Sequence, residues 1–111
     1  MRLESERQGE ILIIRALDDR IDAAGAIRFK ERMREMVTEP SDRVVFDMSN
    51  VAFLDSSGLG AVVSVMKSLE PPRRLELSGL TATVEKVFRL TRMDSVFIIH
   101  KTLPEARRNA G

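Results

Sequence analysis

The chain has 111 residues, enough for one compact domain, which excludes a two-domain enzyme. Its 18 Lys and Arg residues nearly balance its 17 Asp and Glu residues, so the net charge of +1 favours neither nucleic acid nor anionic membrane as a direct partner. The absence of cysteine excludes disulfides, thiolate nucleophiles and cysteine-type zinc sites. With one histidine and neither tryptophan nor tyrosine, general-base catalysis and base stacking lack their usual side chains.

The sequence also lacks the patterns of membrane insertion and secretion. No apolar run reaches the ~20 residues that span a bilayer, and residues 1–10 alternate charges where a signal peptide has an apolar core. We therefore expect a cytoplasmic protein that does not bind membrane.

Residues 3–17 predict a β-hairpin with Gln8-Gly9-Glu10 as its turn. Beyond it, apolar residues recur at three- and four-residue steps from Ala26 to Val37, which predicts an amphipathic helix with Asp22 as its N-cap. Pro40 disfavours helical geometry at the residue before it, so this helix should end near Glu39.

From Arg43 onward the predicted order is strand, helix, strand, helix, strand, which requires parallel pairing through right-handed crossovers. The strands are predicted at 43–48, 75–78 and 96–99. Apolar stripes at helical spacing over 59–69 and 84–91 mark two helices, the first with a polar start, and a short helix is predicted at 103–108. The fold class is therefore α/β, a mixed β-sheet made of the N-terminal hairpin plus parallel strands and packed with about four helices. We expect residues 1–111 to form a single domain with Asn109-Ala110-Gly111 frayed at its end.

The most informative segment is Asn50–Gly60, where a predicted strand leads into an apolar helix. Read alone, it is a capped helix start: Asp55 or Ser56 accepts a bond from a free backbone N–H, and Gly58 and Gly60 let the first turn pack closely on the sheet. A cap needs only one such residue. The additional hydroxyls stand where the positive end of a helix dipole favours negative charge.

Four segments spread over nearly the whole chain carry a family resemblance: Arg20–Ala24, Val44–Ser49, Phe53–Gly60 and Met93–Phe97. They resemble the STAS domain family, and within it the small single-domain anti-sigma factor antagonists (anti-anti-sigma factors) of bacteria. The Asp-Ser-Ser-Gly-Leu-Gly core at residues 55–60 is the most specific of the four, because it follows a predicted strand and begins an apolar helix.

The resemblance implies a phosphorylation switch at Ser57, the residue that matches the second serine of the motif. The implied partner is an anti-sigma factor that is also a serine protein kinase and that binds the ATP. The unphosphorylated chain would bind this partner and release its sigma factor or another target. Phosphorylation would switch binding off, and a PP2C-type phosphatase would reset it.

The same resemblance implies a partner-binding surface around Ser57. This surface contains Asp22, Asp55, Ser56, Gly58 and Gly60, with Ser56 mainly supporting the helix start. The chain itself would be no enzyme, would need no cofactor or metal, and would be a monomer when free.

Two positions depart from the family pattern. Asp19 stands where the family often has glycine, and because aspartate tolerates left-handed geometry the turn should survive. Arg92 stands where the family often has the glycine of a Thr-Gly pair. Arginine lacks glycine's ease at positive φ, so we expect the end of the third helix to be closed differently.

Three other interpretations stay open at this point. The first is an unphosphorylated STAS subunit with a structural role in a lipid transporter or a stress-signalling complex. The second is a small hydrolase or nucleotide-binding protein, although a triad of Ser57, His100 and Asp55 lacks the Gly-x-Ser-x-Gly motif and Val63 stands where a dinucleotide loop needs its third glycine. The third is a metal cluster of Asp22, Asp47 and Asp55. We expect His100 to be an exposed residue at the end of a strand.

Overall fold

The computed structural model describes residues 1–108 and contains two sheets. The predicted fraying of Asn109-Ala110-Gly111 lies outside the described residues. The larger sheet has the strand order β1-β2-β4-β6-β7. Its strands are β1 (Leu3–Gln8), β2 (Ile11–Ala16), β4 (Arg43–Asp47), β6 (Leu75–Ser78) and β7 (Ile98–His100).

The β1–β2 pair is the predicted antiparallel hairpin, and every other pair in this sheet is parallel. Gly9 lies in the hairpin turn with φ +61°, a conformation that suits glycine. The mixed sheet predicted from the sequence is therefore confirmed. The second sheet, which the sequence did not predict, pairs β3 (Arg20–Ile21) with β5 (Phe53–Leu54) in parallel.

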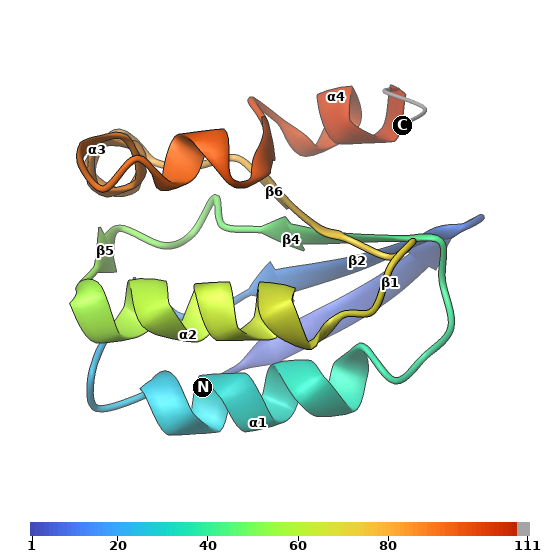
Figure 1. The fold of residues 1–111 in the computed structure, drawn as a ribbon, viewed down its shortest axis with the longest axis horizontal. Helices are drawn as coiled ribbons and strands as arrows, with labels where there is room; N and C mark the ends of the chain where they lie inside the picture. The colour runs from blue at the N-terminus through green and yellow to red at the C-terminus, as the bar shows by residue number, and fades with distance from the viewer. Residues whose placement is uncertain (109–111) are drawn as a thin grey trace.

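The helices cover both faces of the larger sheet (Figure 1). Two of them, α1 (Ala26–Met36) and α2 (Ser56–Ser68), lie side by side on one face and run in the same direction. On the other face lie α3 (Ala82–Leu90) and α4 (Leu103–Arg108). None of the helices in residues 1–108 is both long and apolar enough to cross a membrane.

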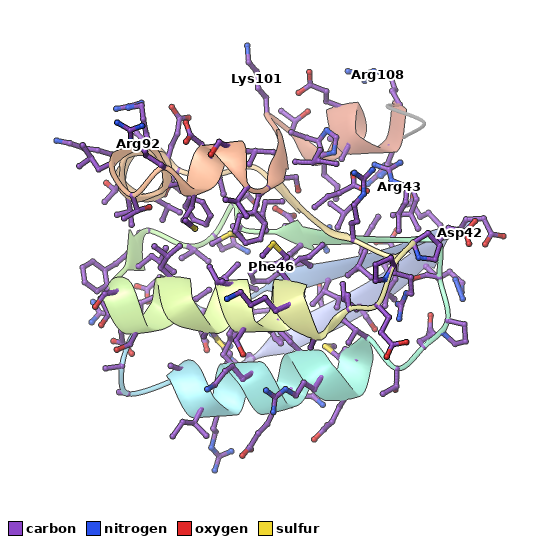
Figure 2. The ribbon with its side chains drawn as sticks, in the orientation of Figure 1. Asp42, Arg43, Phe46, Arg92, Lys101 and Arg108 are labelled. Carbon is purple, nitrogen blue, oxygen red and sulfur yellow. The ribbon has the colours of Figure 1, made fainter. Side chains whose placement is uncertain are left out.

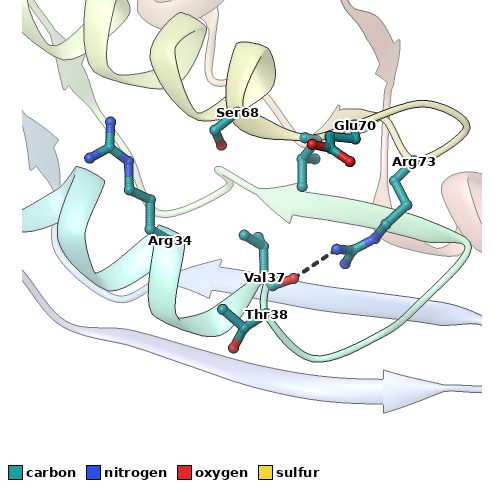
Figure 3. A pocket seen from close by; sticks show the side chains of 7 residues that line it. Arg34, Val37, Thr38, Ser68, Glu70 and Arg73 are labelled. Carbon is teal, nitrogen blue, oxygen red and sulfur yellow. Dashed lines mark hydrogen bonds between the residues drawn. The ribbon is translucent and has the colours of Figure 1, made fainter.

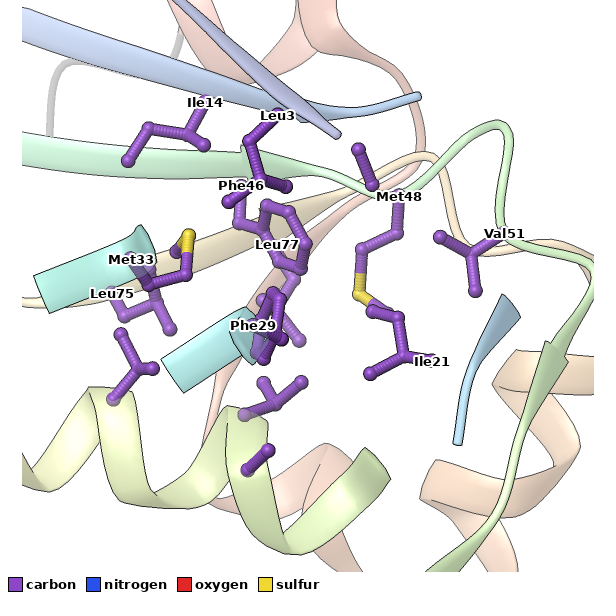
Figure 4. Packing of buried hydrophobic residues seen from close by; sticks show 14 of the residues in the cluster. Leu3, Ile14, Ile21, Phe29, Met33, Phe46, Met48, Val51, Leu75 and Leu77 are labelled. Atoms are coloured by element: carbon purple, nitrogen blue, oxygen red, sulfur yellow. The ribbon is translucent and has the colours of Figure 1, made fainter. Parts of the chain in front are cut away.

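The main core fills the space between the sheet and the α1–α2 layer (Figure 4). Alternate residues of the strands point into it, as the two-residue period of a strand requires: Leu12, Ile14, Val44, Phe46, Leu75 and Leu77. Phe29 of α1 meets Phe46 of β4 with ring centroids 5.5 Å apart. On the opposite side, Phe88 of α3 packs edge-on against Phe97 at 5.7 Å.

The other face of the sheet carries buried charge beneath α4. Glu76 of β6 accepts hydrogen bonds from Arg43 Nε at 2.7 Å, and its Oε1 lies 2.8 Å from His100 Nε2. Arg43 also donates to the carbonyl of Ala106 in α4 at 2.9 Å. Figure 2 shows Arg43 below α4. Burial raises the pKa of Glu76, but the hydrogen bonds from Arg43 and His100 outweigh this and leave the pKa below its ordinary value. The prediction of an exposed His100 is wrong, because this carboxylate gives the ring a buried partner.

The helix ends differ in two places from the sequence prediction. Helix α1 ends at Met36, before Glu39, with Val37 as its C-cap. At the end of α3, Arg92 takes the left-handed conformation, φ 61° and ψ 19°, and is followed by the 3-10 turn η1 (Met93–Ser95). The expectation that an arginine would close this helix differently is therefore wrong: Arg92 adopts the geometry that a glycine would supply.

At the far end of the α1–α2 layer, Arg73 holds the connection between α1 and β4. Its guanidinium donates to the carbonyls of Val37, Ser41 and Glu39 at 2.8, 2.8 and 3.1 Å. A pocket of about 390 Å³ lies beside it (Figure 3), lined by Arg34, Val37, Thr38, Ser68, Leu69, Glu70 and Arg73. The Arg73 guanidinium that lines this pocket is therefore engaged in hydrogen bonds to the backbone carbonyls of residues 37–41.

Candidate functional site

Asp55 fixes the start of α2. Its Oδ1 accepts a hydrogen bond from Gly58 N at 2.8 Å, which is the predicted N-cap bond, and its Oδ2 accepts one from Ala23 N at 3.0 Å. The bond from Gly58 lowers the pKa of Asp55 below its ordinary value of 3.8; loss of hydration opposes this, and the bond from Ala23 adds to it. The carboxylate is therefore ionised at neutral pH and ties the loop after β3 to the helix.

Gly58 allows α2 to approach β3 closely. A Cβ at this position would lie 1.9 Å from the carbonyl oxygen of Ile21 and 3.0 Å from the Leu54 side chain. No side chain fits there, so the motif glycine is required by packing. This contact brings the loop after β3 and the first turn of α2 together.

Gly60 has a different environment. A Cβ there would meet nothing within 4 Å, and the residue is exposed on the outer face of α2. The prediction that both glycines let the first turn pack closely therefore holds for Gly58 and is wrong for Gly60. Gly60 instead leaves the helix surface flat one turn beyond Ser57.

Ser56 and Ser57 occupy the first two helical positions after the Asp55 cap, and both are exposed. Free backbone N–H groups and the positive end of the helix dipole face this turn. A hydroxyl at Ser57 is thus accessible to another protein, and a negative group attached to it would meet a favourable local field.

Asp22 lies beside this turn but is not the N-cap of α1. That position is held by Gly25, and Asp22 instead accepts a hydrogen bond from Gly25 N at 3.2 Å, one turn before the helix. The prediction of Asp22 as the N-cap of α1 is therefore wrong, because Asp22 lies three residues before the observed N-cap, Gly25. Its carboxylate is about one-fifth exposed, on the same loop that Asp55 holds.

Asp19 keeps the turn before β3 without left-handed geometry, since Arg92 is the sole non-glycine residue with positive φ within residues 1–108. Its carbonyl accepts bonds from Ala52 N at 2.7 Å and Phe53 N at 3.2 Å. The turn survives the missing family glycine, as expected, although through an ordinary backbone conformation.

The sequence reasoning missed Arg20 and Phe53, which pair across β3 and β5. The Arg20 guanidinium stacks over the Phe53 ring, 5.6 Å from its centroid, and lies 3.6 Å from Asp22 Oδ2. Both side chains are exposed, at 61% for Arg20 and 43% for Phe53. The missed signal was a large apolar residue, Phe53, two positions before the polar motif that begins at Asp55, together with an arginine directly before Ile21-Asp22.

The alternative sites do not assemble. His100 pairs with Glu76 under α4, while Ser57 is exposed at the start of α2, so the structure does not bring these two triad members together. The Asp47 carboxylate accepts hydrogen bonds from Arg15 Nε and from Ser49 N. Among residues 1–108, no three acidic or histidine side chains are placed to hold a metal ion, and Asp22, Asp47 and Asp55 form no such group.

Comparisons with known proteins place these features in one family. The STAS domain matches residues 2–106. A curated relative, the anti-sigma-B factor antagonist of Listeria monocytogenes, is 29% identical over 90 residues, which cover 80% of this chain and 79% of that protein.

Solved structures share the fold. An anti-sigma factor antagonist from Mycobacterium paratuberculosis has a TM-score of 0.86 at 21% identity, covering 96% of this chain and 90% of that one. The Bacillus cell fate determinant SpoIIAA in its phosphorylated form has a TM-score of 0.68 at 22% identity, covering 99% and 100%. With the Asp55-capped helix, the close approach at Gly58 and the mixed sheet in place, the chain belongs to the STAS domain family.

Proposed function

We propose that this chain is an anti-sigma factor antagonist whose binding is switched by phosphorylation of Ser57. The observation that carries the proposal is the exposed Ser57 hydroxyl at the capped N-terminus of α2. The names of the similar proteins support the role: the Listeria relative is an anti-sigma-B factor antagonist, and SpoIIAA exists in a phosphorylated form.

The proposed partner is an anti-sigma factor with serine kinase activity that binds ATP. The γ-phosphoryl group passes from ATP to Ser57 Oγ, ADP leaves, and the hydroxyl proton passes to a base on the partner. A PP2C-type phosphatase then returns the serine by hydrolysis. The chain acts as substrate and binding module in this cycle, in the cytoplasm, and performs no chemistry of its own.

The charges around Ser57 explain why phosphate would weaken binding without unfolding the domain. A phosphate adds about −1.5 to −2 charge, which the helix N-terminus tolerates. In a tight complex, however, this charge must be desolvated close to the carboxylates of Asp22 and Asp55, both of which belong to the same loop and turn. The effect therefore falls on the interface.

Phosphopeptide mapping tests the acceptor site. After incubation with ATP and each anti-sigma factor kinase of the source organism, trypsin releases residues 44–67 as one fragment by cleaving after Arg43 and Lys67. Fragmentation should place the phosphate on Ser57 and not on Ser49, Ser56 or Ser64. A phosphate on Ser56 would overturn the assignment, and no phosphate with any kinase would favour an unphosphorylated scaffold subunit of a transporter or stress-signalling complex.

Ser57→Asp and Ser57→Ala separate binding from folding. Ser57→Ala should bind the partner and resist phosphorylation, whereas Ser57→Asp should bind much more weakly while folding normally. Thr83→Asp is the matched control, because Thr83 is exposed at the second position of α3 as Ser57 is of α2. If Thr83→Asp lowers partner affinity as much as Ser57→Asp, the interface mechanism is wrong.

A further inference from the structure

Arg20 is a cation held loosely at the edge of the Ser57 surface. Its ion pairs are long, 3.6 Å to Asp22 and 3.8 Å to Asp19, and its side chain is 61% exposed. Exposed pairs of this kind contribute little to stability. The guanidinium is kept in place mainly by stacking on Phe53. It can therefore exchange its acidic partner with little loss of free energy.

The backbone places Arg20 within reach of Ser57. Ile21, the residue after Arg20, touches Gly58, the residue after Ser57. Consecutive Cα atoms are about 3.8 Å apart, so Arg20 and Ser57 are each one residue away from a direct backbone contact. The Arg20 side chain already extends along this edge to Asp22, whose loop is hydrogen-bonded to Asp55 at the start of α2.

We propose that Arg20 is the intramolecular counter-ion of a phosphate on Ser57. This rests on the proposed function only for the presence of that phosphate. A phosphate dianion offers three acceptor oxygens and about twice the charge of one carboxylate, and it matches the planar fork of a guanidinium. Arg20 therefore exchanges Asp22 for the phosphate, which leaves the Asp22 carboxylate without this cation.

The exchange gives the switch a second component. In the unmodified chain, Arg20 partly neutralises Asp22 and stacks on Phe53, and all three are presented together to a partner. In the phosphorylated chain, Arg20 pairs with the phosphate on Ser57. A partner then meets Asp22 without the Arg20 charge beside it, and the stacking of Arg20 on the Phe53 ring is changed. The modification thus changes the charge pattern of β3 as well as that of α2.

The test measures the second pKa of phosphoserine by phosphorus NMR. Phosphoserine is incorporated at position 57 during translation, so that no kinase is needed, and the resonance is titrated around pH 6. Because a nearby cation favours the dianion, Arg20→Gln should raise this pKa by about 0.5 unit relative to the unsubstituted phosphoprotein. The difference should shrink at about 1 M salt, where the screening length is about 3 Å.

Two further variants complete the design. Arg32→Gln removes the same charge from an exposed pair on the outer face of α1 and should leave the phosphate pKa unchanged. Arg20→Lys keeps the charge without the fork and should give an intermediate pKa. Equal pKa values for Arg20→Gln and Arg32→Gln would overturn the proposal. A kinase that fails to modify Ser57 would overturn the proposed function and leave this measurement untouched.

Discussion

The carbonyl oxygen of Ile21 occupies the space in which a side chain at Gly58 would begin, with only 1.9 Å between that oxygen and an added Cβ. A backbone oxygen cannot move aside without breaking the short β3–β5 pair that Ile21 belongs to. The surface around Ser57 is therefore set by backbone packing between β3 and α2.

Gly58→Ala should destabilise the domain strongly, by about 3 kcal/mol or more, because the clash is with backbone rather than a flexible side chain. Gly60→Ala is its control. The same substitution two residues along, on the exposed side of the helix, meets open space and should stabilise the helix by about 0.5–1 kcal/mol. Urea unfolding of both variants measures the two effects, and similar stabilities for the pair would contradict the packing account.

Arg92→Gly should stabilise the protein. Arg92 is left-handed, which costs a residue with a Cβ roughly 1–2 kcal/mol, while glycine loses about 0.5–1 kcal/mol through its freer unfolded chain. The expected net gain in the free energy of unfolding is therefore about 0.5–1 kcal/mol. Arg92→Ala retains a Cβ and should show no gain; if alanine stabilises as much as glycine, backbone strain is not the cause.

The Asp55 carboxylate should make stability depend on pH. Its pKa in the folded chain is lowered below 3.8, so its contribution is present above that value and is lost as pH falls through the folded pKa. Asp55→Asn cannot titrate and loses the charge that accepts from Ala23 N. The variant should therefore be less stable than wild type near about pH 7, and the difference should close as the pH falls below 3.8 and through the lowered folded pKa. Chemical denaturation across this range gives the answer, and a pH-independent difference would refute the linkage.

Glu76→Gln should cost about 3 kcal/mol of stability, because it removes the negative charge from a largely buried ion pair with Arg43. In contrast, Glu35→Gln breaks the exposed pair with Arg32 and should change stability by less than about 1 kcal/mol. Thermal and urea unfolding of the two variants can be compared directly. Equal losses would show that the cluster under α4 is no stronger than a surface pair.

Regular periodicity made most of the fold predictable from the sequence. The β1–β2 hairpin, the parallel strands and the short α4 helix at residues 103–108 all follow from apolar spacing and turn residues. The strands β3 and β5 did not, because two residues are too few to show a period. The same limit hid the stacking of Arg20 on Phe53, which depends on that pairing.

Long-range partners were the second limit. His100 stands beside Lys101 at the end of a strand, and nothing nearby in sequence signals the buried Glu76 that binds it. Likewise, the sequence motif suggested packing roles for two glycines, but only the position of Ile21 distinguishes Gly58 from Gly60. Which residues are polar or small is visible in a sequence; what faces them across the fold is not.

The hydrogen bonds by which Arg73 holds the connection between α1 and β4 have a practical consequence for surface-immobilised assays. Because α1 and α2 run in parallel, the end held by Arg73 lies opposite the end that carries Ser57. Glu70 is exposed at that held end, and the chain contains no cysteine. A single thiol introduced by Glu70→Cys would therefore anchor the protein to a sensor chip in one orientation, with the first turn of α2 pointing away from the solid support.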